Sequence, residues 1–157
     1  MISITQDEEQ RYLQLQEMAL DFARHGNVFE LSKMIDAGLN IDLCDTKGNT
    51  LLMLASYNNQ EEVVTYLIQN NASIDKRNDR GQTPLAGVCF KGYLNIVKIL
   101  VENGANKYAN NGMGTTPITF ASLFGHKDIY EYLTNNKRNK FYTWLNTSMF
   151  YIKSLFK

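Results

Sequence analysis

The chain repeats itself at an interval of 33 residues, and this interval constrains its fold more than any other feature. Three similar stretches begin at Gly48, Gly81 and Gly114 and read "GNTLLMLASYNN", "GQTPLAGVCFKG" and "GTTPITFASLFG". A weaker copy, "ALDFARHGNVFELSKMIDAGLNID", occupies residues 19–42. A fixed period of this length indicates a stack of similar units, each packed on its neighbours, with atypical units at the ends.

The residue pattern of each unit predicts two short helices that are joined by a turn and followed by a polar loop. A threonine in each stretch suits a helix N-cap, and Pro84 and Pro117 follow it at the first helical position, where no N–H is needed. Apolar residues at i, i+1 and i+4, such as Ile96, Val97 and Leu100, indicate the second helix. The turn falls at residues able to adopt a positive φ: Gly26, Asn59, Gly92 and Gly125. The sequence therefore predicts an all-α solenoid.

The stretch "GQTPLAGVCFKGYLNIVKILVENGAN" resembles an ankyrin repeat, which has this period and a T-P-L-H-x-A signature. More narrowly, the chain is similar to small single-domain ankyrin proteins of bacteria. The resemblance implies a solenoid of about four helix-turn-helix repeats that binds other proteins. The signature histidine is replaced by Met53, Ala86 and Thr119. Because that histidine makes a hydrogen bond between adjacent units in the family, we expect stability to depend more on apolar packing here.

The register divides the chain into three parts. Residues 1–18 are expected to form an N-terminal helical extension that caps the repeats, and residues 134–157 a basic, aromatic linker and helix. The repeat domain between them covers residues 19–133, with four units, numbered 1 to 4, at about 19–44, 45–77, 78–110 and 111–133.

The resemblance also implies which residues contact a partner, because the family binds with its loop tips and the exposed face of its first helices. The loop-tip candidates are Lys47, Asn49, Asp79, Arg80, Gln82, Met113 and Thr115. The first-helix candidates are Arg24, His25, Tyr57, Asn58, Phe90, Lys91, Leu123 and Phe124. Among them, Tyr57, Phe90 and Phe124 form a ladder of aromatic residues typical of a protein-binding hot spot. An alternative is that some of these rings pack between adjacent helices.

Residues suited to catalysis or to metal binding are few and scattered. Cys44 and Cys89 form no CxxC pair, and His25 and His126 lack the spacing of a metal site or a catalytic triad. Lys91 stands before the last glycine of its stretch with no serine or threonine after it, which argues against a phosphate loop. We therefore expect no catalytic, metal-binding or cofactor-binding residues and no cofactor, with an enzyme as the alternative.

The charges are unevenly placed although the net charge is zero. Residues 1–21 carry a net charge of −4, from five acids against Arg11, and residues 134–157 carry +5, from five basic residues without an acid. Between these two segments the acidic and basic residues nearly balance, so the charge does not indicate nucleic-acid binding. Because the start is acidic and no apolar run is long enough to span a bilayer, we expect a cytoplasmic protein.

The C-terminal segment leaves three interpretations open. It covers the open end of the last repeat, it docks on a partner or a second copy, or it lies on a membrane surface as an amphipathic anchor, which would make the protein a membrane-tethered scaffold. The apolar residues concerned are Phe141, Trp144, Leu145, Phe150, Ile152 and Phe156.

Overall fold

The computed structural model describes residues 5–135 of the chain, and within this range the chain forms eight α-helices. Their bounds are α1 Gln6–His25, α2 Val28–Asp36, α3 Leu51–Tyr57, α4 Glu61–Gln69, α5 Pro84–Lys91, α6 Leu94–Glu102, α7 Pro117–Leu123 and α8 Lys127–Thr134. The prediction of an all-α chain is confirmed for the described residues. The C-terminal docking candidates lie outside the described residues: Phe141, Trp144, Leu145, Phe150, Ile152 and Phe156.

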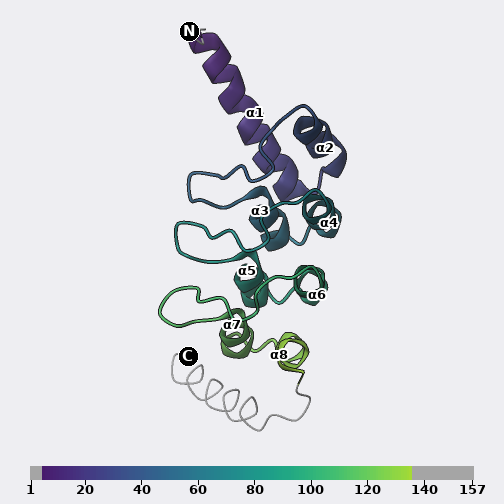
Figure 1. The fold of residues 1–157 in the computed structure, drawn as a ribbon, viewed down its shortest axis with the longest axis vertical. Coiled ribbons are helices and arrows are strands. Elements are labelled where there is room, and N and C mark those ends of the chain that lie inside the picture. Colours follow the sequence, from purple (N-terminus) through teal and green to yellow (C-terminus); the bar gives the residue numbers. More distant parts are fainter. Residues whose placement is uncertain (1–4, 136–157) are drawn as a thin grey trace, which may run out of the picture.

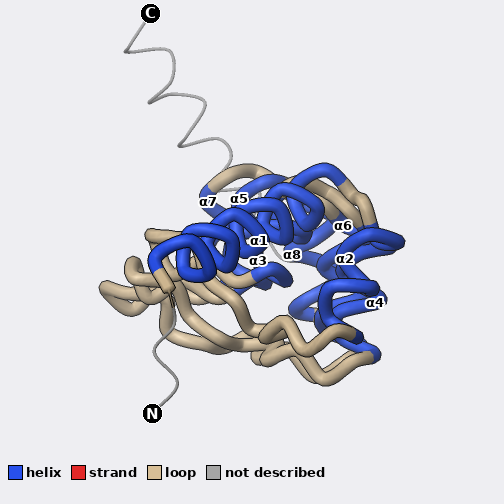
Figure 2. The backbone as a smooth tube through the Cα atoms, turned by 90° about the horizontal axis from the view of Figure 1, so that it is seen from above, coloured by secondary structure: helices blue, strands red, loops and turns tan. Residues whose placement is uncertain are grey.

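The helices form pairs that stack in chain order (Figure 1). Helices α1, α3, α5 and α7 make one column in which each contacts the next, and α2, α4, α6 and α8 make the second column in the same way. The long loops between the pairs all project to the same side, beyond the first column (Figure 1), and seen from above they gather along one side of the helices (Figure 2). Each unit therefore presents its loop and its first helix to a common face.

Threonine caps set the start of three first helices. The hydroxyls of Thr50, Thr83 and Thr116 each accept a hydrogen bond from the backbone N–H three residues later. Pro84 and Pro117 occupy the first helical position, as the sequence predicts. These caps place the helices α3, α5 and α7 in the same register in successive units.

The turn between the two helices of each unit uses a residue with a positive φ. The four predicted positions, Gly26, Asn59, Gly92 and Gly125, have φ values of 82°, 61°, 85° and 80°. Asparagine is among the few residues other than glycine that adopt this left-handed region readily, which explains why Asn59 replaces glycine at one turn.

The core lies between the two columns of helices. It contains the i, i+1 and i+4 residues of the second helices, all at most 7% exposed: Val63, Val64, Leu67, Ile96, Val97, Leu100, Ile129, Tyr130 and Leu133. Leu52 and Leu85 of the first helices are also buried, but Ile118 at the same register position of α7 is half-buried. The last described unit is thus less covered than the two before it.

Side chains also link neighbouring units by hydrogen bonds. The Gln60 amide donates to the Arg24 carbonyl at 2.8 Å, and His126 Nε2, at the same register position two units later, lies 3.0 Å from the Phe90 carbonyl. Two equivalent aspartates act similarly in the loops: Asp42 accepts from the Ser73 N–H and Asp75 from the Asn106 N–H. Neighbouring units are therefore joined by polar contacts although the family histidine is replaced.

Helix α1 is longer than the other helices and runs past the repeat stack (Figure 1). It begins with a capping box in which Thr5 and Glu8 each bond the other's backbone N–H. Its last turns bury Ala19, Leu20 and Ala23, whereas its N-terminal part is exposed. The division of the chain at residue 18 stays a prediction, since α1 is continuous through this point.

Candidate functional site

Three loops at the edge of the stack share one backbone arrangement, and we call them finger 1 (residues 45–49), finger 2 (78–82) and finger 3 (111–115). In each finger the N–H of the first residue donates to the carbonyl of the last, at N···O distances of 3.0, 3.0 and 2.7 Å. Because this bond closes a tight loop, the tips are held in place before any partner binds. The fingers carry all of the loop-tip candidates predicted from the sequence.

Side chains inside fingers 1 and 2 fix the tips further. Asp45 accepts from the backbone N–H groups of Lys47 and Asn49, and Asn78 accepts in the same way within finger 2. Partial burial acts to raise the pKa of Asp45, but hydrogen bonds from Asn49 and Lys47 and the charge of Arg24 outweigh it, so the pKa lies below its ordinary value. Finger 1 is therefore built around an ionised carboxylate.

Fingers 1 and 2 are bonded to each other. The N–H of Asp79 donates to the carbonyl of Lys47 at 3.1 Å, and the amide of Asn78 donates to the Asn49 side chain at 2.9 Å. Finger 3 makes a different link: its first residue, Asn111, is buried and accepts a hydrogen bond from the Thr83 N–H at 2.7 Å. Fingers 1 and 2 are thus tied to each other, and finger 3 is tied to the start of α5, directly after finger 2.

An aromatic row, consisting of Tyr57, Phe90 and Phe124, crosses three successive units. The Tyr57 and Phe90 rings are stacked with centroids 6.4 Å apart, and Phe90 meets Phe124 edge to face at 4.5 Å. Each ring remains about two-fifths exposed, at 40%, 38% and 43%. The rings therefore pack on one another, as the alternative interpretation expects, and still present apolar surface to solvent. Their role as a binding hot spot stays a prediction.

A lysine, Lys91, lies beside the aromatic row. The ammonium group of Lys91 lies 4.7 Å from the centre of the Tyr57 ring and 6.0 Å from that of Tyr93. At the first of these distances a cation is attracted to the face of an aromatic ring. Lys91 is exposed, so it adds a positive charge beside the aromatic row.

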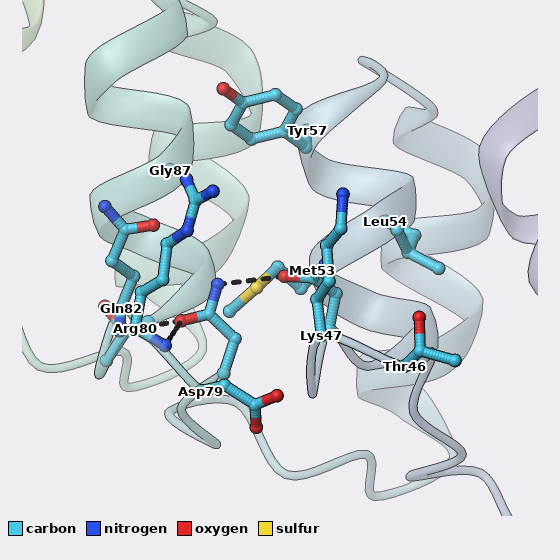
Figure 3. A pocket seen from close by; sticks show the side chains of 12 residues that line it. Thr46, Lys47, Met53, Leu54, Tyr57, Asp79, Arg80, Gln82 and Gly87 are labelled. Atoms are coloured by element: carbon cyan, nitrogen blue, oxygen red, sulfur yellow. Dashed lines mark hydrogen bonds between the residues drawn. The ribbon is translucent and has the colours of Figure 1, made fainter.

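A pocket of about 370 Å³ lies between fingers 1 and 2 and the helices α3 and α5 (Figure 3). We call it the inter-unit pocket. It is lined by six of the residues predicted to contact a partner: Lys47, Asn49, Tyr57, Asp79, Arg80 and Gln82. The side chains of Lys47 and Arg80 extend along opposite sides of the pocket, with Tyr57 beyond them, while the Asp79 carboxylate points away from that ring (Figure 3).

Sequence reasoning missed three residues that form the apolar part of this pocket, namely Met53, Leu54 and Gly87. Gly87 was the one feature of the sequence that could have revealed this pocket. It stands inside α5, where glycine is unfavourable, and the same register position holds Leu54 in α3 and Phe120 in α7. A Cβ on Gly87 would lie 3.2 Å from the Tyr57 ring, so the missing side chain makes room for that ring and for the pocket.

The other predicted residues lie outside the inter-unit pocket. Arg24 is half-buried and paired with Asp21 at 2.6 Å and Asp45 at 3.7 Å, while His25 is exposed, with Nδ1 2.8 Å from a carbonyl in its own helix. Asn58 is exposed at the end of α3, where its amide bonds the Leu54 carbonyl.

The remaining predicted residues belong to unit 4. Met113 is fully exposed at the tip of finger 3 with a φ of 47°, and Leu123 is 46% exposed beside the aromatic row. Thr115 is half-buried and bonds within its own finger.

Cys89 is fully buried, and burial raises the pKa of its thiol, which disfavours the reactive thiolate. Within residues 5–135, no group of three His, Cys, Asp or Glu side chains is placed to hold a metal ion. None of the helices described is both long and apolar enough to cross a membrane.

Comparison with known proteins adds one positive finding. The family model described as "Ankyrin repeats (3 copies)" matches residues 17–78 and 70–144, which together span more than half of the chain. A comparison with curated proteins finds no match.

Proposed function

Because this chain belongs to the ankyrin repeat family, whose repeats are generally protein–protein interaction modules, we propose that it binds a protein partner through its fingers and first helices. The observation that carries the proposal is the aromatic row. Three exposed rings contact one another across successive units, and the first of them, Tyr57, lines the inter-unit pocket together with charged finger side chains.

The physical basis is the composition and the rigidity of this surface. Aromatic residues contribute much of the binding energy at protein interfaces, particularly where polar groups surround them. The fingers are closed by internal hydrogen bonds and the helices are capped, so little conformational entropy is lost when a partner binds. Such a surface presents a preformed site to a folded partner and serves an adaptor, an inhibitor or an effector, in keeping with a cytoplasmic, non-enzymatic protein.

The proposal is tested by affinity capture with two matched triple variants. One variant replaces the aromatic row by alanine at Tyr57, Phe90 and Phe124. The control replaces three exposed aromatic residues elsewhere, Tyr12, Phe29 and Tyr108, which are 54%, 66% and 65% exposed. Both variants are checked for helix content by circular dichroism, and captured proteins are identified by mass spectrometry.

We expect the control to retain the partners of the wild-type chain. The aromatic-row variant should lose at least roughly a hundredfold in affinity, since a truncated hot-spot residue costs about 2 kcal/mol or more and such losses are not additive. Capture of the same partners by a folded aromatic-row variant contradicts the proposal. The identified partner then decides between adaptor, inhibitor and effector.

The membrane-tethered scaffold depends on residues that the structure does not describe, so it stays a prediction. Liposome flotation of the full chain and of a chain ending at residue 136 distinguishes it from protein binding. A membrane anchor predicts that only the full chain floats with anionic liposomes. Absence of lipid association in both chains contradicts the anchor.

A further inference from the structure

We propose that the inter-unit pocket accepts an aromatic side chain of the partner, and that an acidic residue lies close to this side chain in the partner sequence. This inference rests on the proposed function and makes it specific, because it names the pocket and the chemistry of the segment that enters it.

The pocket owes its space to one residue. Gly87 is the only position of its register without a side chain within α3, α5 and α7, where the equivalents are Leu54 and Phe120. Glycine in a helix costs about 0.5–1 kcal/mol relative to alanine. Its φ is not in the left-handed region, so the backbone does not require glycine there. The missing side chain instead leaves a hollow beside Tyr57.

The lining of the hollow suits an aromatic guest. Met53 and Leu54 are buried at 5% and 8% exposure and supply apolar atoms, and the thioether of a methionine interacts favourably with a ring. The half-exposed Tyr57 ring offers a stacking partner. The volume of about 370 Å³ is within the range of pockets that hold small ligands, so it admits a large side chain.

The charges at the rim favour an acidic neighbour for this guest. Lys47 and Arg80 are exposed and form no ion pair with any described residue, and Lys91, which lies over the Tyr57 ring, likewise forms no ion pair with the described residues. The one acid among the lining residues, Asp79, turns its carboxylate away from Tyr57 and against finger 1, where a Cβ on Gly48 would lie 2.5 Å from it. The open side of the pocket is therefore positively charged, which attracts and orients a carboxylate.

The walls of the pocket are fixed by bonds already described. Fingers 1 and 2 are joined through the Lys47 carbonyl and the Asn49 side chain, and Thr50 and Thr83 cap the two helices. The backbone positions of Lys47 and Arg80 are consequently set by the scaffold, although their side chains are exposed. A partner carboxylate at the rim therefore meets both cations without requiring the loops to become ordered.

The first experiment selects ligands without assuming a partner. A phage library of random linear peptides is panned on the immobilised full chain, and enriched peptides are synthesised with a fluorescent label for titration. We expect enriched sequences in which Phe, Tyr or Trp stands close to Asp or Glu. Failure to enrich any peptide, or enrichment of peptides that lack this pairing, overturns the inference.

Substitutions in the chain then locate the binding site. Gly87→Leu fills the hollow with the side chain that position 54 carries in α3 and displaces the Tyr57 ring, which a Cβ alone would approach to 3.2 Å. Once circular dichroism has shown that this variant is folded, we expect at least roughly tenfold weaker peptide binding. Arg80→Glu reverses the charge at the rim and is expected to have a similar effect. The control is Arg77→Glu, an exposed residue of the same loop that does not line the pocket, for which we expect less than about a twofold change.

A double-mutant cycle tests the carboxylate directly. The acidic residue of an enriched peptide is replaced by its amide and measured against the wild-type chain and against Arg80→Gln. We expect a coupling of roughly fivefold, within the range for groups in direct contact. Coupling absent within error, or peptide binding that Gly87→Leu leaves unchanged, overturns the inference. If the aromatic-row variant still abolishes such binding, the proposed function holds while the pocket assignment fails.

Discussion

The junction between units 2 and 3 and the junction between units 3 and 4 are built on the same register, yet they present different surfaces. At the first junction Gly87 leaves a hollow between α3 and α5, with a cation on each side. At the equivalent place in α7, Phe120 supplies a ring that stacks near Phe124, with centroids 6.4 Å apart. Finger 3 also carries Met113 where fingers 1 and 2 carry Lys47 and Arg80.

The difference teaches that the backbone of the solenoid and its binding chemistry are separable. The caps, the turns and the second-helix core are the same at both junctions, so they fix where a side chain stands. The residue placed at one register position then decides whether that place is a pocket or a filled surface. A comparison of equivalent substitutions at the two junctions measures how far this separation holds.

The largest effect is expected in the core. Leu85→Ala removes a fully buried side chain and should lower the free energy of unfolding by about 2–5 kcal/mol. Ile118→Ala, at the same register position in α7, should cost less because Ile118 is only half-buried. Urea denaturation followed by circular dichroism measures both. Equal losses of unfolding free energy in the two variants contradict the conclusion that the core of unit 4 is less buried.

The second largest effect on stability is expected from the asparagine side chains that make polar contacts at the two junctions. Asn111→Ala leaves the buried Thr83 N–H without its acceptor and should cost about 1–3 kcal/mol. Asn78→Ala should cost less, because the Arg80 N–H, the Gln82 N–H and the Asn49 side chain that it bonds are exposed or only partly buried, so water replaces the lost partner. A larger loss for Asn78→Ala in urea denaturation indicates that finger 2, rather than the buried link, holds the junctions together.

A smaller effect concerns Gly87 itself. Gly87→Ala improves helix propensity by about 0.5–1 kcal/mol, but its Cβ would lie 3.2 Å from the Tyr57 ring and force that ring to move. We therefore expect the gain in stability to be larger in a Tyr57→Ala background than in the wild-type chain. The four proteins of this cycle are compared by thermal and urea unfolding. The same gain in both backgrounds shows that Tyr57 does not depend on the space at Gly87.

Most of the solenoid was predictable from the sequence because its determinants are local. A threonine at the N-cap with proline after it favours a helix start through local bonds alone, and Asn59 or Gly92 turns the chain through its own φ. The repeat interval then places equivalent residues in successive units on one face. The family assignment follows from the same local pattern, and the family match confirms it.

The existence of the pocket, and whether each predicted binding residue is free or already bonded, depend on contacts between units. The alignment of the repeats does not reveal these contacts. Arg24 occupies a predicted binding position, yet Asp21 and Asp45 engage its guanidinium. The alignment of Gly87 with Leu54 and Phe120 was visible, but the hollow exists only because Tyr57 and two fingers surround it. Contacts of this kind join residues of different units and do not repeat at the 33-residue interval, so the sequence of one unit does not predict them.

The smallest expected effect concerns the residue that begins each finger. Units 3 and 4 use Asn78 and Asn111 at this position, whereas unit 2 uses Asp45, so Asp45→Asn converts finger 1 to the type of finger 2. The amide retains an oxygen that accepts from the backbone N–H groups of the finger. It loses the charge that Arg24 faces at 3.7 Å.

The pKa of Asp45 in the folded protein lies below the ordinary value of 3.8, so the ionised carboxylate stabilises the fold. This contribution is complete above the pKa of the unfolded chain and is lost as the pH falls through the lower pKa of the folded state. The wild-type chain should therefore lose stability relative to Asp45→Asn below about pH 4, while the other carboxylates titrate equally in both proteins. Urea unfolding across this range measures the difference. A difference that stays constant with pH shows that finger 1, like finger 2, is held by its hydrogen bonds and not by its charge.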